Sequence, residues 1–269
     1  MQARRKIAVA GATGRVGRHV VDVLTAGGHD VVAMARSRGV DVVTGVGLAE
    51  ALAGVECVID VTTGPSPEQE AATAFFTTAA RNLHEAGDGA GARRMVVVSI
   101  IGCDRFTGGY GAAVAAHERA AMSGPIPATV LRAAQFHEFV AQLVEWGTQG
   151  EVSYVQKMRT QPVAARNVGE ALADLAIEPD SAPAPGSAGA PFPEIAGPRE
   201  EDLVDLAARL VARRGDPLRI ETVSDPADPD RDVFEKGGLL PGPGAMLAGP
   251  TFEEWLDTGD AAPSVIAAH

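Results

Sequence analysis

The sequence has few aromatic residues, few cysteines and no long apolar run. Aromatic side chains make up 4% of the 269 residues, so alanine, valine and leucine must fill any core. The two cysteines, Cys57 and Cys103, lack CxxC spacing, which argues against a disulfide framework and a zinc site, and we expect no metal. No segment approaches the roughly 20 apolar residues of a membrane span, and no apolar signal region is present. We therefore expect a soluble, cytoplasmic protein with no membrane partner.

Positive charge is also in short supply. The chain has 23 Lys and Arg against 35 Asp and Glu, which gives a formal net charge of −12 at pH 7. This balance argues against nucleic acid or an anionic membrane as a partner, although it leaves room for a local basic pocket. The apolar content of 46% is ample for one large α/β domain.

Short apolar segments alternate with amphipathic ones over the first part of the chain. The predicted strands are residues 7–10, 31–35, 57–61, 95–100 and 128–132, and the predicted helices are residues 16–26, 48–53, 68–86, 112–122 and 136–146. Apolar strands separated by helices are typical of a parallel sheet covered on both faces. We predict an α/β fold with a doubly wound parallel sheet of the Rossmann type. Any ligand should then lie at the carboxyl edge of the sheet.

A glycine-rich turn follows the first predicted strand. The sequence Gly11-Ala12-Thr13-Gly14-Arg15-Val16-Gly17 joins that strand to a predicted helix. Gly11 permits a tight turn, Gly14 lets a diphosphate approach bare backbone, and Gly17 lets helix and strand pack closely. The start of the helix adds N–H groups and a partial positive charge. In this context the motif predicts dinucleotide binding. The predicted contacts are Gly11, Thr13, Gly14, Arg15, Val16 and Gly17.

Two arginines follow the second predicted strand. The end of this strand meets the adenosine ribose in a doubly wound sheet, and an acidic residue there would bind the 2′-hydroxyl of NAD. This chain has Arg36 and Arg38 instead, whose guanidinium groups suit a 2′-phosphate. The alternative is that both are solvated surface residues. We predict NADP(H) as the cofactor.

The pattern loosens after residue 149. We predict an NADP-binding Rossmann core over residues 1–149 and a smaller substrate-side C-terminal region of the same domain over residues 150–269. Asn167 is predicted to cap a helix over residues 168–177. Residues 178–193, rich in Pro, Ala and Gly, are predicted to form a loop.

Several motifs resemble those of a known family. The glycine turn, Val96-Val97-Val98-Ser99-Ile100-Ile101-Gly102 and Val130-Leu131-Arg132-Ala133-Ala134-Gln135-Phe136 are similar to atypical short-chain dehydrogenases/reductases of the NmrA-like, NAD(P)H-binding type. The resemblance covers nearly the whole chain. It implies cofactor contacts with Thr62, Thr63 and Ser99, and a substrate pocket beside Phe136.

The chain departs from this family at the positions of the usual catalytic residues. Family members that reduce carbonyls carry Tyr-x-x-x-Lys, in which the tyrosine donates a proton and the lysine lowers its pKa. Here Tyr110 is followed by Val114 at the lysine position, and Ile101 replaces the usual Ser/Thr. The residue that usually approaches the adenine, the Asp of a Gly-Asp-Leu motif, is also missing from Gly45-Val46-Gly47-Leu48.

Three interpretations of the chemistry remain open. His137 is the first substitute proton donor, because it follows a strand at the ligand-binding edge and histidine titrates near neutral pH. Tyr110 is the second, acting alone or with His117, which lies two helical turns further along. The third is that the protein carries out no chemistry. Each of these side chains also has a purely structural interpretation.

The leading functional prediction is an NADPH-dependent oxidoreductase that acts on a small carbonyl or enone-like substrate with a non-standard proton donor. Its partners would be small molecules, and a homodimer is left open. One alternative is a non-catalytic NADP(H)-sensing regulatory protein of the NmrA type. Another is a lyase, cyclase or isomerase on the same fold.

Overall fold

The chain folds into two compact units. The computed structural model describes residues 4–178 and 192–258. The first unit comprises Met1–Ala133 and Arg166–Glu194, and the second comprises Ala134–Ala165 and Ile195–His269. The chain therefore passes from one unit to the other three times, and none of these passages lies at residue 149, where the sequence pattern loosens.

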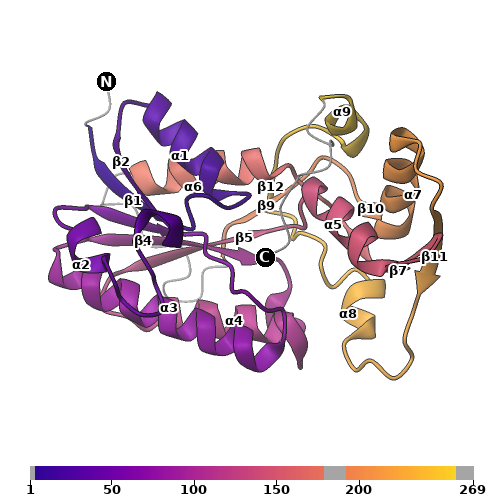
Figure 1. Ribbon diagram of the computed structural model, residues 1–269, viewed down its shortest axis with the longest axis horizontal. Helices are drawn as coiled ribbons and strands as arrows, with labels where there is room; N and C mark the ends of the chain where they lie inside the picture. The colour runs from indigo at the N-terminus through magenta and orange to yellow at the C-terminus, as the bar shows by residue number, and fades with distance from the viewer. Residues whose placement is uncertain (1–3, 179–191, 259–269) are drawn as a thin grey trace. The chain divides into compact units, whose positions relative to one another are not determined.

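A parallel sheet forms the centre of the first unit (Figure 1). Five of its strands precede Ala134: β1 (Lys6–Ala10), β2 (Asp30–Met34), β3 (Cys57–Asp60), β4 (Arg94–Ile100) and β5 (Ala128–Ala133). They lie in the order β2-β1-β3-β4-β5, and each neighbouring pair is parallel. The interior strands are almost entirely buried because helices cover both faces, which explains their continuous apolar sequences.

Helices cover the two faces of this sheet in separate layers (Figure 1). One layer holds α1 (Gly17–Ala26) and α6 (Ala165–Ile177). The other holds α2 (Leu48–Ala51), α3 (Gln69–Gly89) and α4 (Gly109–Met122). Two helices on one side and three on the other make the fold a doubly wound, Rossmann-type α/β fold, as predicted.

Helix α6 joins the first unit although it follows residue 149 in the chain. Gly169 packs so closely on α1 that a Cβ built there would lie 2.8 Å from His19 Cβ. The Arg94 guanidinium donates to the carbonyls of Leu175 (2.8 Å) and Glu178 (3.0 Å). These long-range contacts place the helix on the sheet, and sequence spacing does not reveal them.

The direction of chain winding reverses between β1 and β3. The chain leaves β1 through α1 to reach β2 on one side, then returns to form β3 on the other side. In such sheets the carboxyl ends of the two strands at the reversal open a crevice for the ligand. The turn after Ala10 and the turn after Asp60 meet at this point.

In the described residues, the second unit is built around short strands and four helices. Its strands β6 (Thr148–Gln149), β7 (Val152–Gln156) and β11 (Arg219–Val223) form one sheet, in the order β11-β7-β6. Strands β8 (Arg159–Thr160) and β10 (Glu201–Asp202) pair antiparallel, and β12 (Met246–Leu247) pairs in parallel with β9 (Glu194–Ala196). The larger helices are α5 (His137–Gly147) and α7 (Leu203–Arg214), with α8 (Arg231–Glu235) and α9 (Phe252–Asp257) after them.

The five predicted strands are confirmed to within one residue at each end. The cap predicted at Asn167 is wrong, since α6 begins at Ala165 and the Asn167 side chain donates to Glu170. The Glu138 carboxylate accepts a hydrogen bond from the Ala165 N–H (3.1 Å). This contact with a distant segment of the chain stabilises an earlier start of the helix.

Most of the loop predicted over 178–193 lies outside the described residues. In the described part of the chain, no helix is long and apolar enough to span a membrane.

Candidate functional site

The predicted site residues fall at the ends of strands and the starts of helices. In the first unit they are Gly11, Thr13, Gly14, Arg15, Val16 and Gly17 between β1 and α1, Arg36 and Arg38 after β2, Thr62 and Thr63 after β3, Ser99 near the end of β4, and Tyr110 and His117 on α4. Phe136 and His137 belong to the second unit, at the start of α5.

The glycine turn is shaped by close backbone approaches that only glycine allows. Gly11 has φ +81°, and a Cβ there would lie 2.7 Å from the Val61 carbonyl oxygen. A Cβ on Gly17 would lie 2.1 Å from the Gly11 carbonyl oxygen. Gly14 is exposed, and a Cβ there would approach only the Gly11 carbonyl oxygen, at 3.1 Å. Two of the glycines therefore build the turn, and the third keeps its outer surface free of side chains.

This turn suits an anionic group. Helix α1 begins at Gly17, its N-cap residue Val16 has no side-chain acceptor to cap it, and its first turn has no acidic residue. A diphosphate would supply the acceptors and the negative charge that such a helix start lacks. The residues present therefore fit the diphosphate of a dinucleotide.

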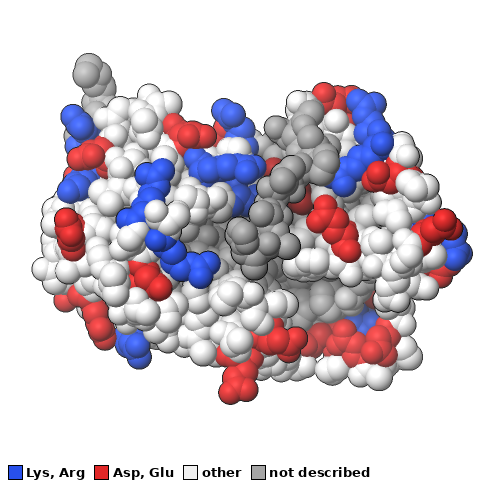
Figure 2. Space-filling view, in the orientation of Figure 1, with Lys and Arg blue, Asp and Glu red and all other residues white. Residues whose placement is uncertain are grey.

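A basic surface accompanies the glycine turn. Arg36 and Arg38 form a short 3-10 turn (η1, Arg36–Arg38) directly after β2, and both are exposed. The glycine turn is tied to this strand, since the N–H groups of Gly11 and Ala12 both donate to the Met34 carbonyl at 3.2 Å. Figure 2 shows basic side chains gathered over β2, α1 and α6 on one face of the first unit. The chain thus combines a local basic surface with an overall charge of −12.

A buried carboxylate lies at the end of β3. Asp60 accepts hydrogen bonds from the Thr62 N–H (2.9 Å) and the Thr62 hydroxyl (2.7 Å) through Oδ1. Its Oδ2 lies 3.0 Å from His117 Nε2 on α4. Burial alone would raise the pKa of Asp60, but the hydrogen bonds and charge of His117 and the bonds from Thr62 bring it below its ordinary value. Asp60 is therefore ionised and accepts hydrogen bonds from both partners.

Phe76 connects the two candidate residues of helix α4. Its ring stacks on His117, with centroids 4.7 Å apart, and lies 5.9 Å from the ring of Tyr110. Val114, at the position where a lysine is usual, is buried in the same apolar cluster. Burial raises the pKa of Tyr110, and valine offers no charge to lower it.

Ser99 belongs to a second polar cluster under α4. Its hydroxyl donates to Glu118 Oε1 at 2.6 Å. The Arg132 guanidinium donates two hydrogen bonds to the same carboxylate, from Nε (2.9 Å) and Nη2 (2.8 Å). Its Nη1 donates to Asp104 (3.1 Å). Ser99 is 4% exposed, so its hydroxyl is committed to this network.

Cys103 is held in the same cluster as a protonated thiol. Its Sγ lies 3.2 Å from Glu118 Oε1. Burial, together with the nearby Glu118 charge, raises the pKa of Cys103 to about 12. A thiolate is the reactive form of cysteine, so this side chain is inert near neutral pH.

His137 is buried in the second unit. Its Nε2 donates to the Pro250 carbonyl (3.1 Å), its ring packs against Phe252 and Trp255, and among the described residues Nδ1 has no hydrogen-bond partner. Burial lowers the pKa of His137 to about 4, although the Pro250 carbonyl opposes the shift. At neutral pH the ring is neutral and holds its proton on Nε2. Neighbouring Phe136 caps α5 through its backbone and is half-buried.

The buried His137 should make the stability of the protein depend on pH. Because the folded pKa of about 4 lies below the ordinary value of 6.5, its contribution is fully present above pH 6.5 and is lost as the pH falls toward 4. A shift of this size corresponds to about 3 kcal/mol. His137→Gln keeps a donor for Pro250 but cannot titrate. Between pH 7 and pH 4, the free energy of unfolding from denaturant titration should fall by about 3 kcal/mol less in this variant than in the wild type. Parallel losses in the two proteins would contradict this role.

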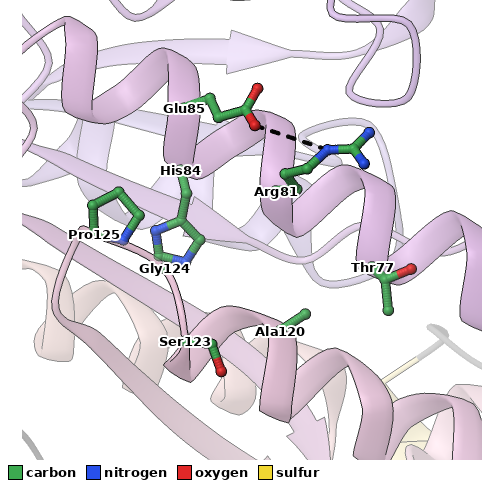
Figure 3. Close-up of a pocket in the computed structure, with 8 residues that line it drawn as sticks. All are labelled: Thr77, Arg81, His84, Glu85, Ala120, Ser123, Gly124 and Pro125. Carbon is green, nitrogen blue, oxygen red and sulfur yellow. Dashed lines mark ion pairs between the residues drawn. The ribbon is translucent and has the colours of Figure 1, made fainter.

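A shallow pocket lies between α3 and α4, away from the glycine turn (Figure 3). It has a volume of about 300 Å³ and is lined by Thr77, Arg81, His84, Glu85, Ala120, Ser123, Gly124 and Pro125. His84 Nε2 donates to the Ala121 carbonyl (2.8 Å), and its Nδ1 accepts the Ile126 N–H (3.3 Å). Because Gly124 and Pro125 precede β5, the pocket lies near the amino ends of the strands, opposite the edge where doubly wound folds bind their ligands.

Sequence reasoning did not identify Asp60 or Phe76 as part of the site. Asp60 carried a usable signal, since an acidic residue at the end of an apolar strand needs buried partners. Phe76 carried none, because an apolar residue on an amphipathic helix gives no sign of which ring it stacks on.

The sequence profile of an NAD(P)H-binding protein family matches residues 11–175. The match begins at the glycine turn and extends through α4, β5 and most of α6. The chain therefore belongs to this NAD(P)H-binding family. No curated protein matches the sequence.

Several solved structures share the fold. A superfamily protein from Agrobacterium tumefaciens with bound NAD is 20% identical, with 94% of this chain and 95% of that chain covered and a TM-score of 0.65. An NADPH-dependent quinone oxidoreductase from Escherichia coli is 19% identical, with 94% and 98% covered and a TM-score of 0.63. The dTDP-4-dehydrorhamnose reductase from Bacillus anthracis, in complex with NADP, is 14% identical, with 94% and 98% covered and a TM-score of 0.63. The chain thus shares the overall fold of these NAD- and NADP-dependent proteins.

Proposed function

We propose that the protein is an NADPH-dependent oxidoreductase acting on a small carbonyl or enone-like organic substrate in the cytoplasm. The observation that carries this proposal is the bare glycine turn at the reversal between β1 and β3, beside the exposed Arg36 and Arg38. The solved E. coli relative, which uses NADPH and acts on a quinone, supports the substrate class.

NADPH should bind more tightly than NADH. Arg36 and Arg38 occupy the positions where an NAD-binding protein needs an acidic residue. Charge-assisted contacts to a phosphate are worth roughly 1.5–3 kcal/mol, or about ten- to hundredfold in affinity. Titration calorimetry with both cofactors measures the difference. Arg36→Ala should remove most of it.

The matched control is Arg81→Ala, which removes an exposed arginine of α3 that pairs with Glu85 beside the shallow pocket. This variant should bind both cofactors as the wild type does. Equal affinity for NADPH and NADH, or no change in Arg36→Ala, would contradict the choice of cofactor.

The bound reduced nicotinamide would supply a hydride to an electrophilic carbon of the substrate. The protein must then supply one proton to complete the reduction. We assign this proton to Tyr110, a half-buried hydroxyl on α4 next to Phe76. His137 is a poor donor because its pKa of about 4 leaves it neutral near pH 7, with its proton held by Pro250. Phe136 is assigned to substrate binding, as the family resemblance implies.

A second candidate function is NADP(H) sensing without catalysis. It is favoured by the burial of Val114 and Ile101, which replace the usual lysine and Ser/Thr with apolar side chains. Assays of NADPH oxidation with a panel of quinones, enones and aldehydes separate the two functions. Turnover of any of them supports the oxidoreductase, whereas tight NADPH binding without turnover across the panel supports the sensor.

A further inference from the structure

Asp60 occupies the point where the winding of the sheet reverses. It is the last residue of β3, where it pairs with Ala10 of β1 and Val97 of β4. Its side chain is fully buried. An ionised carboxylate at such a position is unfavourable unless hydrogen bonds replace the water it has lost.

Three donors replace that water. The Thr62 N–H and hydroxyl donate to Oδ1, and His117 Nε2 donates to Oδ2. A carboxylate only accepts, so the Thr62 hydroxyl proton is committed to Asp60. The Thr62 oxygen can then act toward a ligand only as an acceptor. The same rule places a proton on His117 Nε2.

The glycine turn packs directly against the turn that Asp60 stabilises. A Cβ on Gly11 would lie 2.7 Å from the Val61 carbonyl oxygen and 3.1 Å from Thr62 Cα. At these distances the two turns have no space between them for a side chain. A shift of Thr62 would therefore move the backbone on which the glycine turn packs.

We propose that Asp60 is a positioning residue for NAD(P)H binding, which acts by fixing the Thr62 turn and presenting the Thr62 oxygen as an acceptor. The cofactor group that it meets must then be a hydrogen-bond donor, such as a ribose hydroxyl or the carboxamide amine. Asp60 also keeps a proton on His117 Nε2, so that one carboxylate joins the nucleotide turn to helix α4. This inference rests on the proposed cofactor binding.

A double-mutant cycle on the NADPH dissociation constant tests the link to Thr62. Asp60→Ala and Thr62→Ala should each weaken binding about tenfold, the value of one good hydrogen bond. The double variant should bind no more weakly than either single one, because both changes remove the same interaction. Asp60→Asn keeps an acceptor for Thr62 and should restore most of the affinity, and Thr62→Ser should bind as the wild type does.

The control is Asp225→Asn, which alters a carboxylate that accepts a backbone N–H two residues on, in the second unit. It should leave NADPH affinity unchanged. A roughly hundredfold, additive loss in the double variant would overturn the inference while leaving cofactor binding intact. If the wild type itself fails to bind NADPH, the proposed function is overturned and the inference with it.

A spectroscopic measurement tests the second part without cofactor. In histidine-labelled wild-type protein, ¹⁵N shifts should show a proton on Nε2 of the His117 ring, which faces the Asp60 carboxylate. In Asp60→Asn, the amide can donate to Nε2, so this nitrogen should lose its proton. Asp60→Asn is also the variant least prone to misfold, so this result remains available if Asp60→Ala does not fold. A His117 ring that keeps its proton on Nε2 in Asp60→Asn would overturn the role assigned to Asp60.

Discussion

Gly14→Val should abolish NADPH binding while the protein stays folded. Gly14 lies on the outer side of the glycine turn, and a Cβ there approaches only the Gly11 carbonyl oxygen, at 3.1 Å. A branched side chain would occupy the space that the diphosphate needs, so we expect affinity to fall more than hundredfold. Titration calorimetry with NADPH gives the affinity, and circular dichroism reports the fold.

The neighbouring glycines would not give so clean a test. At Gly17 a Cβ would lie 2.1 Å from the Gly11 carbonyl oxygen, so any side chain there disturbs the turn itself. Gly89 provides the matched control, because a Cβ there meets nothing within 4 Å. Gly89→Val should bind NADPH as the wild type does. A folded Gly14→Val that still binds NADPH would show that the cofactor site lies elsewhere.

Tyr110→Phe should lower turnover about 10²–10⁴-fold, the usual effect of removing a general acid. Burial raises the pKa of this tyrosine, and Val114 supplies no charge to reverse the shift. The hydroxyl is therefore a slow acid even in the wild type. The measurement compares turnover at saturating NADPH, once the substrate panel has identified a compound that is reduced.

Two histidine variants serve as the comparison. His117→Gln keeps a donor for Asp60, and His137→Gln keeps one for Pro250, so each preserves the local hydrogen bond while removing a titratable ring. Turnover should stay within a few-fold of the wild type in both. Loss confined to His137→Gln would reinstate that residue as the acid. Full activity in all three variants would mean that water donates the proton or that the reaction is not a carbonyl reduction.

The sequence motifs rank His137 ahead of Tyr110 as a proton donor, whereas the burial of His137 leads us to propose the opposite order. His137 follows a strand, as expected, but its ring is directed into the core of the second unit against Phe252 and Trp255. Those two residues come from a segment more than a hundred positions further along the chain. No local pattern reveals such a contact, and burial is what lowers the pKa of His137.

The sequence alone determined the doubly wound sheet and the glycine turn. Both depend on local physics: apolar runs of strand length, amphipathic helices between them, and glycines at positions where a Cβ would collide with backbone. The predicted strand ends agree with the observed ones to within one residue, because each apolar run ends where the strand is no longer buried.

The tertiary structure alone decided which polar groups work together. Asp60 and His117 are 57 positions apart in the sequence. Glu118 binds both Ser99 and Arg132, and these three residues come from three different elements. Hydrogen bonds between such groups depend on how α4 packs on the sheet. That packing rests on contacts between residues far apart in the sequence. The sequence therefore specifies where a dinucleotide could bind, while the packing of α4 decides which side chains are neutral, which are charged and which protons are already committed.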